Sequence, residues 1–130
     1  MRYLLDTNVL IAMFRGRPKI REGILKTGFE NCIVSEISLG ELLVGVYKSG
    51  LDKHRHEVQF VKEHFNSLPV SGAIEQYAKL RAELEADGIR LDNFDLLIAA
   101  SAITEGLTLV THNTKHFEKI PRLLVKDWEH

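Results

Sequence analysis

The sequence predicts an α/β fold in which helices cover both faces of a parallel β-sheet. Two observations lead to this prediction. Short apolar runs typical of buried strands recur along the chain, and longer segments with helical spacing of their apolar residues separate them. Strands that alternate with helices favour parallel pairing and a sheet buried between two helical layers.

Five short apolar runs are the predicted strands. Each is too short to be a stable helix, for which about ten residues are the usual minimum. The predicted strands are Arg2–Leu5, Cys32–Val34, Leu68–Val70, Leu107–Thr111 and Leu123–Val125.

The segments between these runs are the predicted helices. One is expected to begin at Thr7, and glycines at positions 88 and 106 are expected to end the last two. The final segment contains "LLIAASAI" and is apolar nearly all round, which is typical of a buried helix. The four longer predicted helices are Glu36–Ser49, His56–Phe65, Ile74–Asp87 and Phe94–Glu105.

Composition limits the class of protein. The 130 residues include only three prolines and no linker-like stretch, so we expect a single domain over residues 1–130. The formal net charge of -1 excludes a protein that binds nucleic acid through bulk positive charge. A lone cysteine, Cys32, excludes an internal disulfide. No signal peptide and no apolar run near the ~20 residues of a membrane span is present, so we expect a cytoplasmic protein.

Three acids occupy positions that invite a functional interpretation. Asp6 directly follows the first predicted strand, where open parallel sheets expose their sites, although it could equally be the N-cap of the next helix. Glu41 lies beside the apolar stripe of its helix, where a carboxylate is costly unless compensated; the alternative is a solvated acid at the edge of the stripe. Asp95 opens the most apolar helix, and its alternative is a first-turn acid behind an Asp92 or Asn93 cap.

Polar residues also follow the fourth predicted strand, at Thr111, His112 and Asn113. If the first and fourth strands are neighbours, Asp6, Thr111 and Asn113 converge. Clustered carboxylates need a counter-charge to stay ionised, and oxygen ligands suit Mg²⁺ or Mn²⁺. Such ions activate water and stabilise the leaving oxygen in phosphodiester cleavage. The residues alone therefore favour a metal-dependent phosphoryl-transfer or nuclease site.

Five motifs resemble those of the PIN-domain family in order and spacing, and most closely its VapC group of toxins. They are "YLLDTNVLI", "SEISLGELLVGV", "DGIRLDNFDLLIAASA", "LTLVTHNTKHFEKI" and "LLVKDW", and together they span residues 3–128. The resemblance implies a three-layer α/β/α sandwich with a central parallel sheet. It also implies a type II toxin that uses Mg²⁺ or Mn²⁺ and metal-activated water to cleave structured RNA, such as tRNA.

The same resemblance implies the partners. It predicts a homodimer that a small VapB-like antitoxin silences, with operator DNA contacted only through the antitoxin. We expect residues Val9–Phe14 and Ile37–Val46 to form a groove for an antitoxin helix. Two alternatives remain: a PIN nuclease of RNA maturation that is not a toxin, and a non-catalytic regulatory module whose acids are helix caps.

Site residues are carried over position by position. Asp6, Glu41 and Asp95 match the family's metal-binding and catalytic acids, and Asn113 matches a fourth catalytic position that is often Asp. Thr7, Asn8, Ser35 and Thr111 match its polar supporting residues, which orient ligands or water.

RNA contacts are expected from the most basic stretch, "KSGLDKHRHE", although such a run is usually a solvated face. Its candidates are Lys48, Lys53 and Arg55. His112 is a further candidate for a phosphate contact, whereas His116 is expected to pack near Phe117. Arg15, Arg17 and Lys19 are equal alternatives to the basic stretch.

Overall fold

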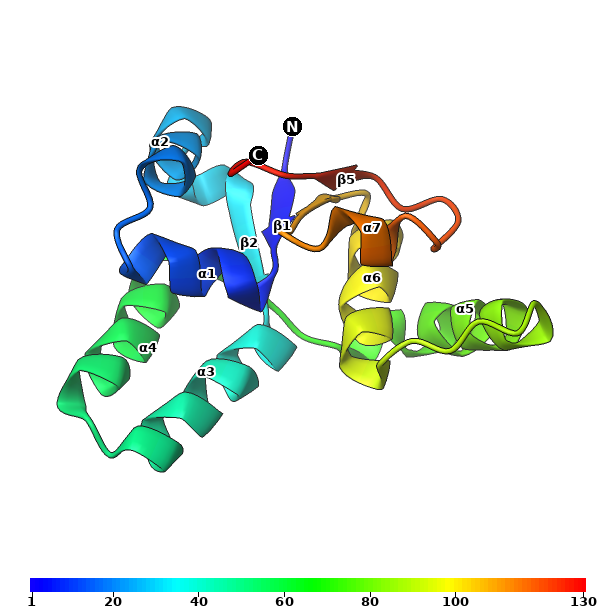
Figure 1. Ribbon diagram of the computed structural model, residues 1–130, viewed down its shortest axis with the longest axis horizontal. Helices are drawn as coiled ribbons and strands as arrows, with labels where there is room; N and C mark the ends of the chain where they lie inside the picture. The colour runs from blue at the N-terminus through cyan, green and yellow to red at the C-terminus, as the bar shows by residue number, and fades with distance from the viewer.

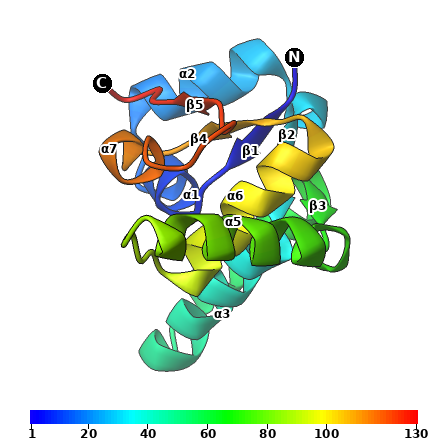
Figure 2. The same cartoon turned by 90° about the vertical axis from the view of Figure 1, so that its right-hand side faces the viewer.

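The computed structural model describes residues 1–130 and contains a five-stranded sheet in which every pair of neighbours is parallel (Figures 1 and 2). The strand order is β3-β2-β1-β4-β5, so the order reverses between β1 and β4. This confirms the predicted parallel sheet and the neighbouring first and fourth strands. The strands are β1 (Tyr3–Leu5), β2 (Cys32–Ser35), β3 (Asn66–Leu68), β4 (Thr108–Val110) and β5 (Val125–Lys126).

Helices cover both faces of the sheet, as predicted. Figure 1 shows α1, α2 and α4 on one side of the strands and α5 and α6 on the other. No helix is both long enough and apolar enough to cross a membrane. The helices are α1 (Thr7–Phe14), α2 (Pro18–Thr27), α3 (Glu36–Ser49), α4 (Asp52–His64), α5 (Ile74–Ala86), α6 (Asn93–Glu105) and α7 (Thr114–Phe117), with 3₁₀ turns at Phe29–Asn31 and Ser71–Ala73.

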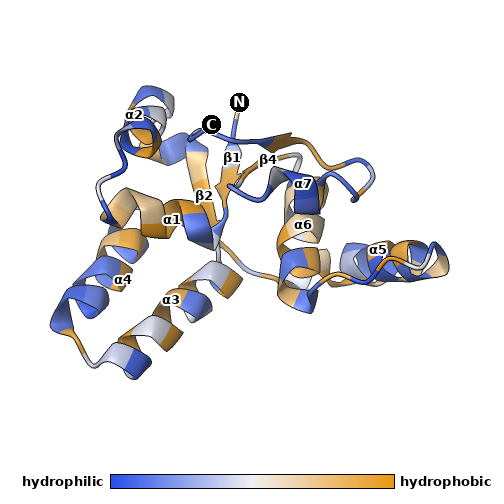
Figure 3. Cartoon of the chain, viewed as in Figure 1, coloured by the Kyte–Doolittle hydropathy of each residue, from blue (hydrophilic) through white to orange (hydrophobic).

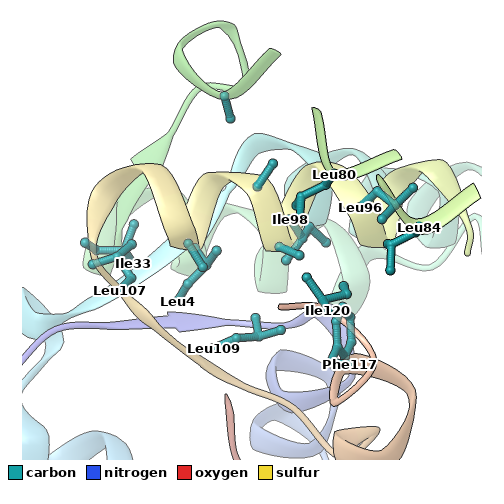
Figure 4. Close-up of a cluster of buried hydrophobic side chains, with 14 residues drawn as sticks. Leu4, Ile33, Leu80, Leu84, Leu96, Ile98, Leu107, Leu109, Phe117 and Ile120 are labelled. Carbon is teal, nitrogen blue, oxygen red and sulfur yellow. The ribbon is translucent and has the colours of Figure 1, made fainter. Parts of the chain in front are cut away.

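Alternation along the strands divides the apolar side chains between two cores. Leu4, Ile33 and Leu109 pack in a cluster with residues of α5 and α6, which Figure 4 shows beside the α6 ribbon. Their successors in the strands, among them Leu5 and Val110, pack with α1, α2 and α4 instead. Figure 3 shows apolar colour on much of β1, β2 and α1, and mixed colour on α4 and α5. The sheet is therefore buried on both faces, which explains its nearly continuous apolar strands.

Three predicted elements differ from the structure by two residues or more at one end or both. The third strand ends at Leu68 rather than Val70, because the Val70 backbone N–H donates to Glu36 Oε1 at 2.9 Å and a 3₁₀ turn follows. This strand pairs only with β2 at the edge of the sheet, so it tolerates the polar Asn66 and Ser67. The fifth strand begins at Val125, two residues later than predicted. The helix predicted over His56–Phe65 is α4, and it begins at Asp52 instead of His56.

Helix α2 was not predicted. Proline at its first position favours its start, but only Ile20 and Ile24 of its ten residues are buried. Gly23 lies in its interior, and a Cβ atom there would stand 2.7 Å from Cε3 of Trp128. The Trp128 ring in turn packs edge-on against Tyr3 with 5.3 Å between ring centroids. The helix therefore depends on tertiary contacts, which the pattern of its own residues does not predict.

Adding a methyl group at Gly23 should destabilise the fold. We expect Gly23→Ala to lower the free energy of unfolding by about 1–3 kcal/mol, because the Trp128 ring must move from a packed position. Gly45→Ala is the matched control: it lies inside α3, and no atom outside the helix's own backbone lies within 4 Å of the added Cβ, so it should raise stability by up to ~1 kcal/mol. Urea unfolding of both variants measures the difference, and equal changes would contradict the proposed packing.

Candidate active site

Asp6 stands at the carboxyl end of the central strand, beside the point where strand order reverses. Its backbone N–H donates to the Val110 carbonyl at 2.9 Å, which extends the β1–β4 pairing to this residue. The side chain is 6% exposed. One carboxylate oxygen accepts from the Thr7 backbone N–H at 2.8 Å, so Asp6 is the N-cap of α1. The cap interpretation is thus correct, but it accounts for only one of the two oxygens.

Thr111 holds the second oxygen of Asp6. The fully buried hydroxyl of Thr111 donates to Asp6 Oδ2 at 2.8 Å. The same hydroxyl oxygen accepts from the Asn113 backbone N–H at 3.1 Å and lies 3.4 Å from Asn8 Nδ2. Asn8 also accepts from the His112 backbone N–H at 3.3 Å. These contacts join the two chain segments that follow β1 and β4, as the sequence predicted for neighbouring strands.

Glu41 reaches the same site from α3. Thr7 Oγ1 lies 2.7 Å from Glu41 Oε1 and 2.8 Å from the buried Ser38 Oγ. An ionised carboxylate can only accept, so the single hydroxyl proton of Thr7 points to Glu41 and Ser38 supplies its own proton to Thr7. Glu41 itself is exposed. It lies on the solvent side of the site, tied to the residue that follows Asp6.

Asp95 enters from the first turn of α6. Asp92 is the N-cap of this helix and accepts from the backbone N–H groups of Phe94 and Asp95, which confirms the capping role expected for it. The Asp95 side chain is therefore free of capping. Its Oδ2 lies 2.9 Å from His116 Nε2 of α7. No local pattern predicts this contact, because 21 residues separate the two positions.

Asp95 interacts electrostatically with both Asp6 and Glu41. Burial raises the pKa of the Asp6 carboxyl, hydrogen bonds from Thr111 and Thr7 oppose this, and the charge of Asp95 raises it further. Burial also raises the pKa of Asp95, against the contact with His116, and the charges of Asp92 and Glu41 add to the rise. The groups that oppose these rises include imidazoles but no lysine or arginine. The site therefore concentrates negative charge without a fixed cation to balance it.

This donor set fits a hard divalent cation. Every converging acid offers carboxylate oxygens, and ionisation of Asp6 and Asp95 is disfavoured in the absence of a cation. No three His, Cys, Asp or Glu side chains form a group that could hold a metal ion by themselves. Mg²⁺ usually binds through one or two carboxylates and keeps several waters, so Asp6 and Asp95 supply enough carboxylates for it.

Other predicted site residues have more varied surroundings. Ser35 is buried and caps α3 by accepting from the Ile37 N–H at 3.1 Å, with no contact to the acids. Asn113 is exposed at the start of α7, and its side chain makes no hydrogen bond. His112 places Nε2 in the interior without a hydrogen-bond partner, so that nitrogen does not face solvent. Two residues that were not predicted as site residues also contact the site: Ser38 is hydrogen-bonded to Thr7, and His116 to Asp95.

A groove of about 490 Å³, lined by both polar and apolar residues, extends from Glu41 between α1, α3 and α4. Arg15 and Lys53 both line it, and Lys48 does not. Arg55 instead lies over the Tyr47 ring, 5.6 Å from its centroid. Two cations from different predicted candidate sets thus share one groove with a site acid.

An apolar hollow of about 480 Å³ lies on the neighbouring surface. It is formed by the end of α1 together with α2 and α4. The expected combination of Val9–Phe14 with Ile37–Val46 lines the groove beside Glu41 instead, through Ile11, Phe14, Leu42 and Gly45. Most apolar residues of α1, such as Val9 and Leu10, belong to the core instead. The hollow is lined by Met13, Phe14, Ile24, Leu25, Phe29 and Phe60, with Arg21, His56 and Glu57 at polar positions.

The chain is similar to known proteins over nearly its whole length. The model of the PIN domain matches residues 3–123. The chain is 35% identical to ribonuclease VapC2 of Rickettsia felis, over 99% of both chains. It is 34% identical to the tRNA(fMet)-specific endonuclease VapC of Salmonella typhimurium, over 98% of both.

Solved structures give the same result. One similar chain comes from the crystal structure of VapBC2 from Rickettsia felis, bound to a DNA fragment from its promoter. The two chains superpose with a TM-score of 0.90 at 32% identity, over 98% of this chain and 99% of the other. A second similar chain comes from the DNA-bound VapBC complex of Salmonella typhimurium. It superposes with a TM-score of 0.91 at 30% identity, over 98% of each chain.

Proposed function

The chain belongs to the PIN-domain family, and on that premise we propose that it is the toxin endoribonuclease of a type II toxin–antitoxin pair. Its proposed substrate is a structured RNA of the tRNA class, as the name of the Salmonella relative suggests. The observation that carries the proposal is that Asp95 repels both Asp6 and Glu41 beside the carboxyl end of β1, and that no lysine or arginine lowers the pKa of Asp6 or Asp95.

Asp6, Asp95 and Glu41 are the proposed holders of Mg²⁺ or Mn²⁺, with Asn113 as a supporting group. When bound, such an ion supplies an activated water and stabilises the charge that develops on the phosphodiester oxygens. The oxygen-only character of the acids and the raised pKa of Asp6 and Asp95 support this assignment.

The chain's own contribution is to keep these carboxylates aimed before substrate arrives. Thr111 fixes Asp6 through a buried hydrogen bond, and Thr7 fixes Glu41. Asn8 ties the segment after β4 to α1, which keeps Thr111 in place. Aligned in advance, such groups do not have to reorganise at the moment of reaction.

We propose that RNA runs along the groove that joins Glu41 to Arg15 and Lys53. Lys53→Ala and Arg15→Ala should each weaken RNA binding and lower the slope of log affinity against log salt concentration by about 0.7–0.9, which corresponds to one phosphate contact. Lys48→Ala is the control, because Lys48 is exposed on α3 but does not line the groove. The measurement is equilibrium binding in EDTA, which prevents cleavage. Equal losses of RNA affinity at all three positions would contradict binding in the groove and would indicate that surface charge acts without regard to position.

The proposed protein partner is a small VapB-like antitoxin, and the relatives of known structure support it because they are VapBC complexes. The apolar hollow between α1, α2 and α4 is the proposed seat for one of its helices, since Leu25 at its rim is 72% exposed. Operator DNA is reached only through the antitoxin, in line with the net charge of -1 on this chain. A homodimer of the toxin is part of the same proposal.

Growth and RNA integrity in cells test the proposed function together. Expression of the chain alone should arrest growth and yield cleaved RNA with discrete internal ends, and co-expression of its antitoxin should restore both. Discrete cleavage without growth arrest would favour a PIN nuclease of RNA maturation. Intact RNA and normal growth at high expression would favour a non-catalytic regulatory module.

A further inference from the structure

His116 occupies a fixed position beside the site. It lies in α7, where the buried Phe117 anchors the turn in the core and the backbone N–H groups of both residues donate to the Asn113 carbonyl. The imidazole packs edge-on against the Phe117 ring, with centroids 5.2 Å apart and planes at 81°. Its Nε2 lies 2.9 Å from Asp95 Oδ2, and both side chains are about one-third exposed. The ring is thus held from one side by packing and from the other by the carboxylate.

Each of the three acids has one side-chain donor of its own. Thr111 donates to Asp6, Thr7 donates to Glu41, and His116 is the only hydrogen-bond partner of the Asp95 side chain. Because an ionised carboxylate only accepts, Nε2 carries the proton in this contact. The bond uses Oδ2 and leaves Oδ1 of Asp95 without a protein partner.

We propose that His116 is a positioning residue that orients Asp95, so that its free oxygen is presented to the divalent cation. The inference rests on the proposed function and extends it to a residue outside the group of acids. We assign His116 no ligand role, because its Nε2–H is donated to Asp95 Oδ2 and the carboxylate oxygens of the acids suit Mg²⁺ better than an imidazole nitrogen. Removing a partner of this kind usually costs 10–100-fold in metal affinity.

The test is calorimetric titration of Mn²⁺ and of Mg²⁺ into the RNA-free protein. His116→Phe keeps an aromatic ring against Phe117 but has no donor, so it should weaken binding of both ions by about tenfold or more. His116→Gln restores an N–H donor of similar reach and should bind within about threefold of wild type. Thermal unfolding in EDTA checks that each variant is folded, and His116→Leu replaces the Phe variant if that one is not.

Three results would overturn the inference. Unchanged affinity in His116→Phe would leave His116 a packing residue. Tighter binding in His116→Phe would make it an occupant that the ion displaces. Loss in both variants, larger for Mn²⁺ than for Mg²⁺, would make it a nitrogen ligand.

Failure of the inference and failure of the proposed function can be told apart. If wild type cleaves RNA but the variants bind metal like wild type, only the role of His116 is lost. If the affinities follow the expected order but wild type cleaves no RNA, the positioning role stands and the nuclease assignment falls. A wild-type protein that binds neither ion contradicts both.

Discussion

Asp6→Asn is expected to reduce RNA cleavage by about a hundredfold or more, with the fold intact. Asparagine caps a helix about as well as aspartate, so the bond from the Thr7 N–H is retained. The substitution removes the negative charge from a site whose work is electrostatic, where loss of one well-placed group typically costs 10²–10³ in rate. Asp95→Asn should have a loss of the same order. Initial rates on a structured RNA at saturating Mg²⁺ or Mn²⁺ measure both.

Asp92→Asn is the matched control for Asp95→Asn. Both acids lie at the start of α6, but the Asp92 carboxylate accepts hydrogen bonds from the backbone N–H groups of Phe94 and Asp95. An amide oxygen can accept the same bonds, so activity should stay within about threefold of wild type. If Asp92→Asn lost as much activity as Asp95→Asn, cleavage would depend on the total negative charge at the start of α6, and Asp95 would have no specific role as a metal ligand.

The second large effect concerns stability and its dependence on metal and pH. In EDTA at neutral pH, Asp6→Asn should be more stable than wild type, because it removes a buried charge that Asp95 repels. At a Mg²⁺ or Mn²⁺ concentration 100 times the dissociation constant, wild type should gain about 2.7 kcal/mol of unfolding free energy, and the variant much less. Urea unfolding with and without metal measures both changes. An equal gain from metal in the two proteins would place the ion elsewhere.

The pH dependence follows from the direction of the Asp6 shift. Its folded-state pKa lies above the ordinary value of 3.8, so the folded protein holds this proton more tightly than the unfolded chain. Between 3.8 and the raised pKa, stability in EDTA must therefore fall as pH rises. Asp95 contributes in the same direction. Asp6→Asn should flatten this decline, and a steeper decline in the variant would contradict the assignment.

Much of the fold was predictable because its strands follow simple local rules. The runs around Leu4, Ile33 and Leu109 are apolar on both faces, as a buried parallel strand requires. The proximity of Asp6 and Thr111 followed from the polar residues after two such strands and from the assumption that the strands are neighbours. The pairing of Leu5 with Val110 confirms that assumption.

The features that were missed depend on tertiary contacts. Helix α2 has only two buried residues and an interior glycine, so its apolar pattern is weak until Trp128 packs against Gly23. The contact of His116 with Asp95 joins residues from two helices, and no local spacing encodes it. The shared groove of Arg15 and Lys53 likewise requires α1 and α4 to be placed side by side.

The most direct test of the account is cleavage of one end-labelled structured RNA by wild type and Asp6→Asn, in EDTA and after addition of excess Mg²⁺ or Mn²⁺. Wild type should be inactive in EDTA and should produce discrete internal cuts once the metal is restored, whereas Asp6→Asn should remain nearly inactive throughout. Cleavage by wild type in EDTA, or equal metal-dependent cleavage by both proteins, would contradict a metal-dependent nuclease site built on Asp6.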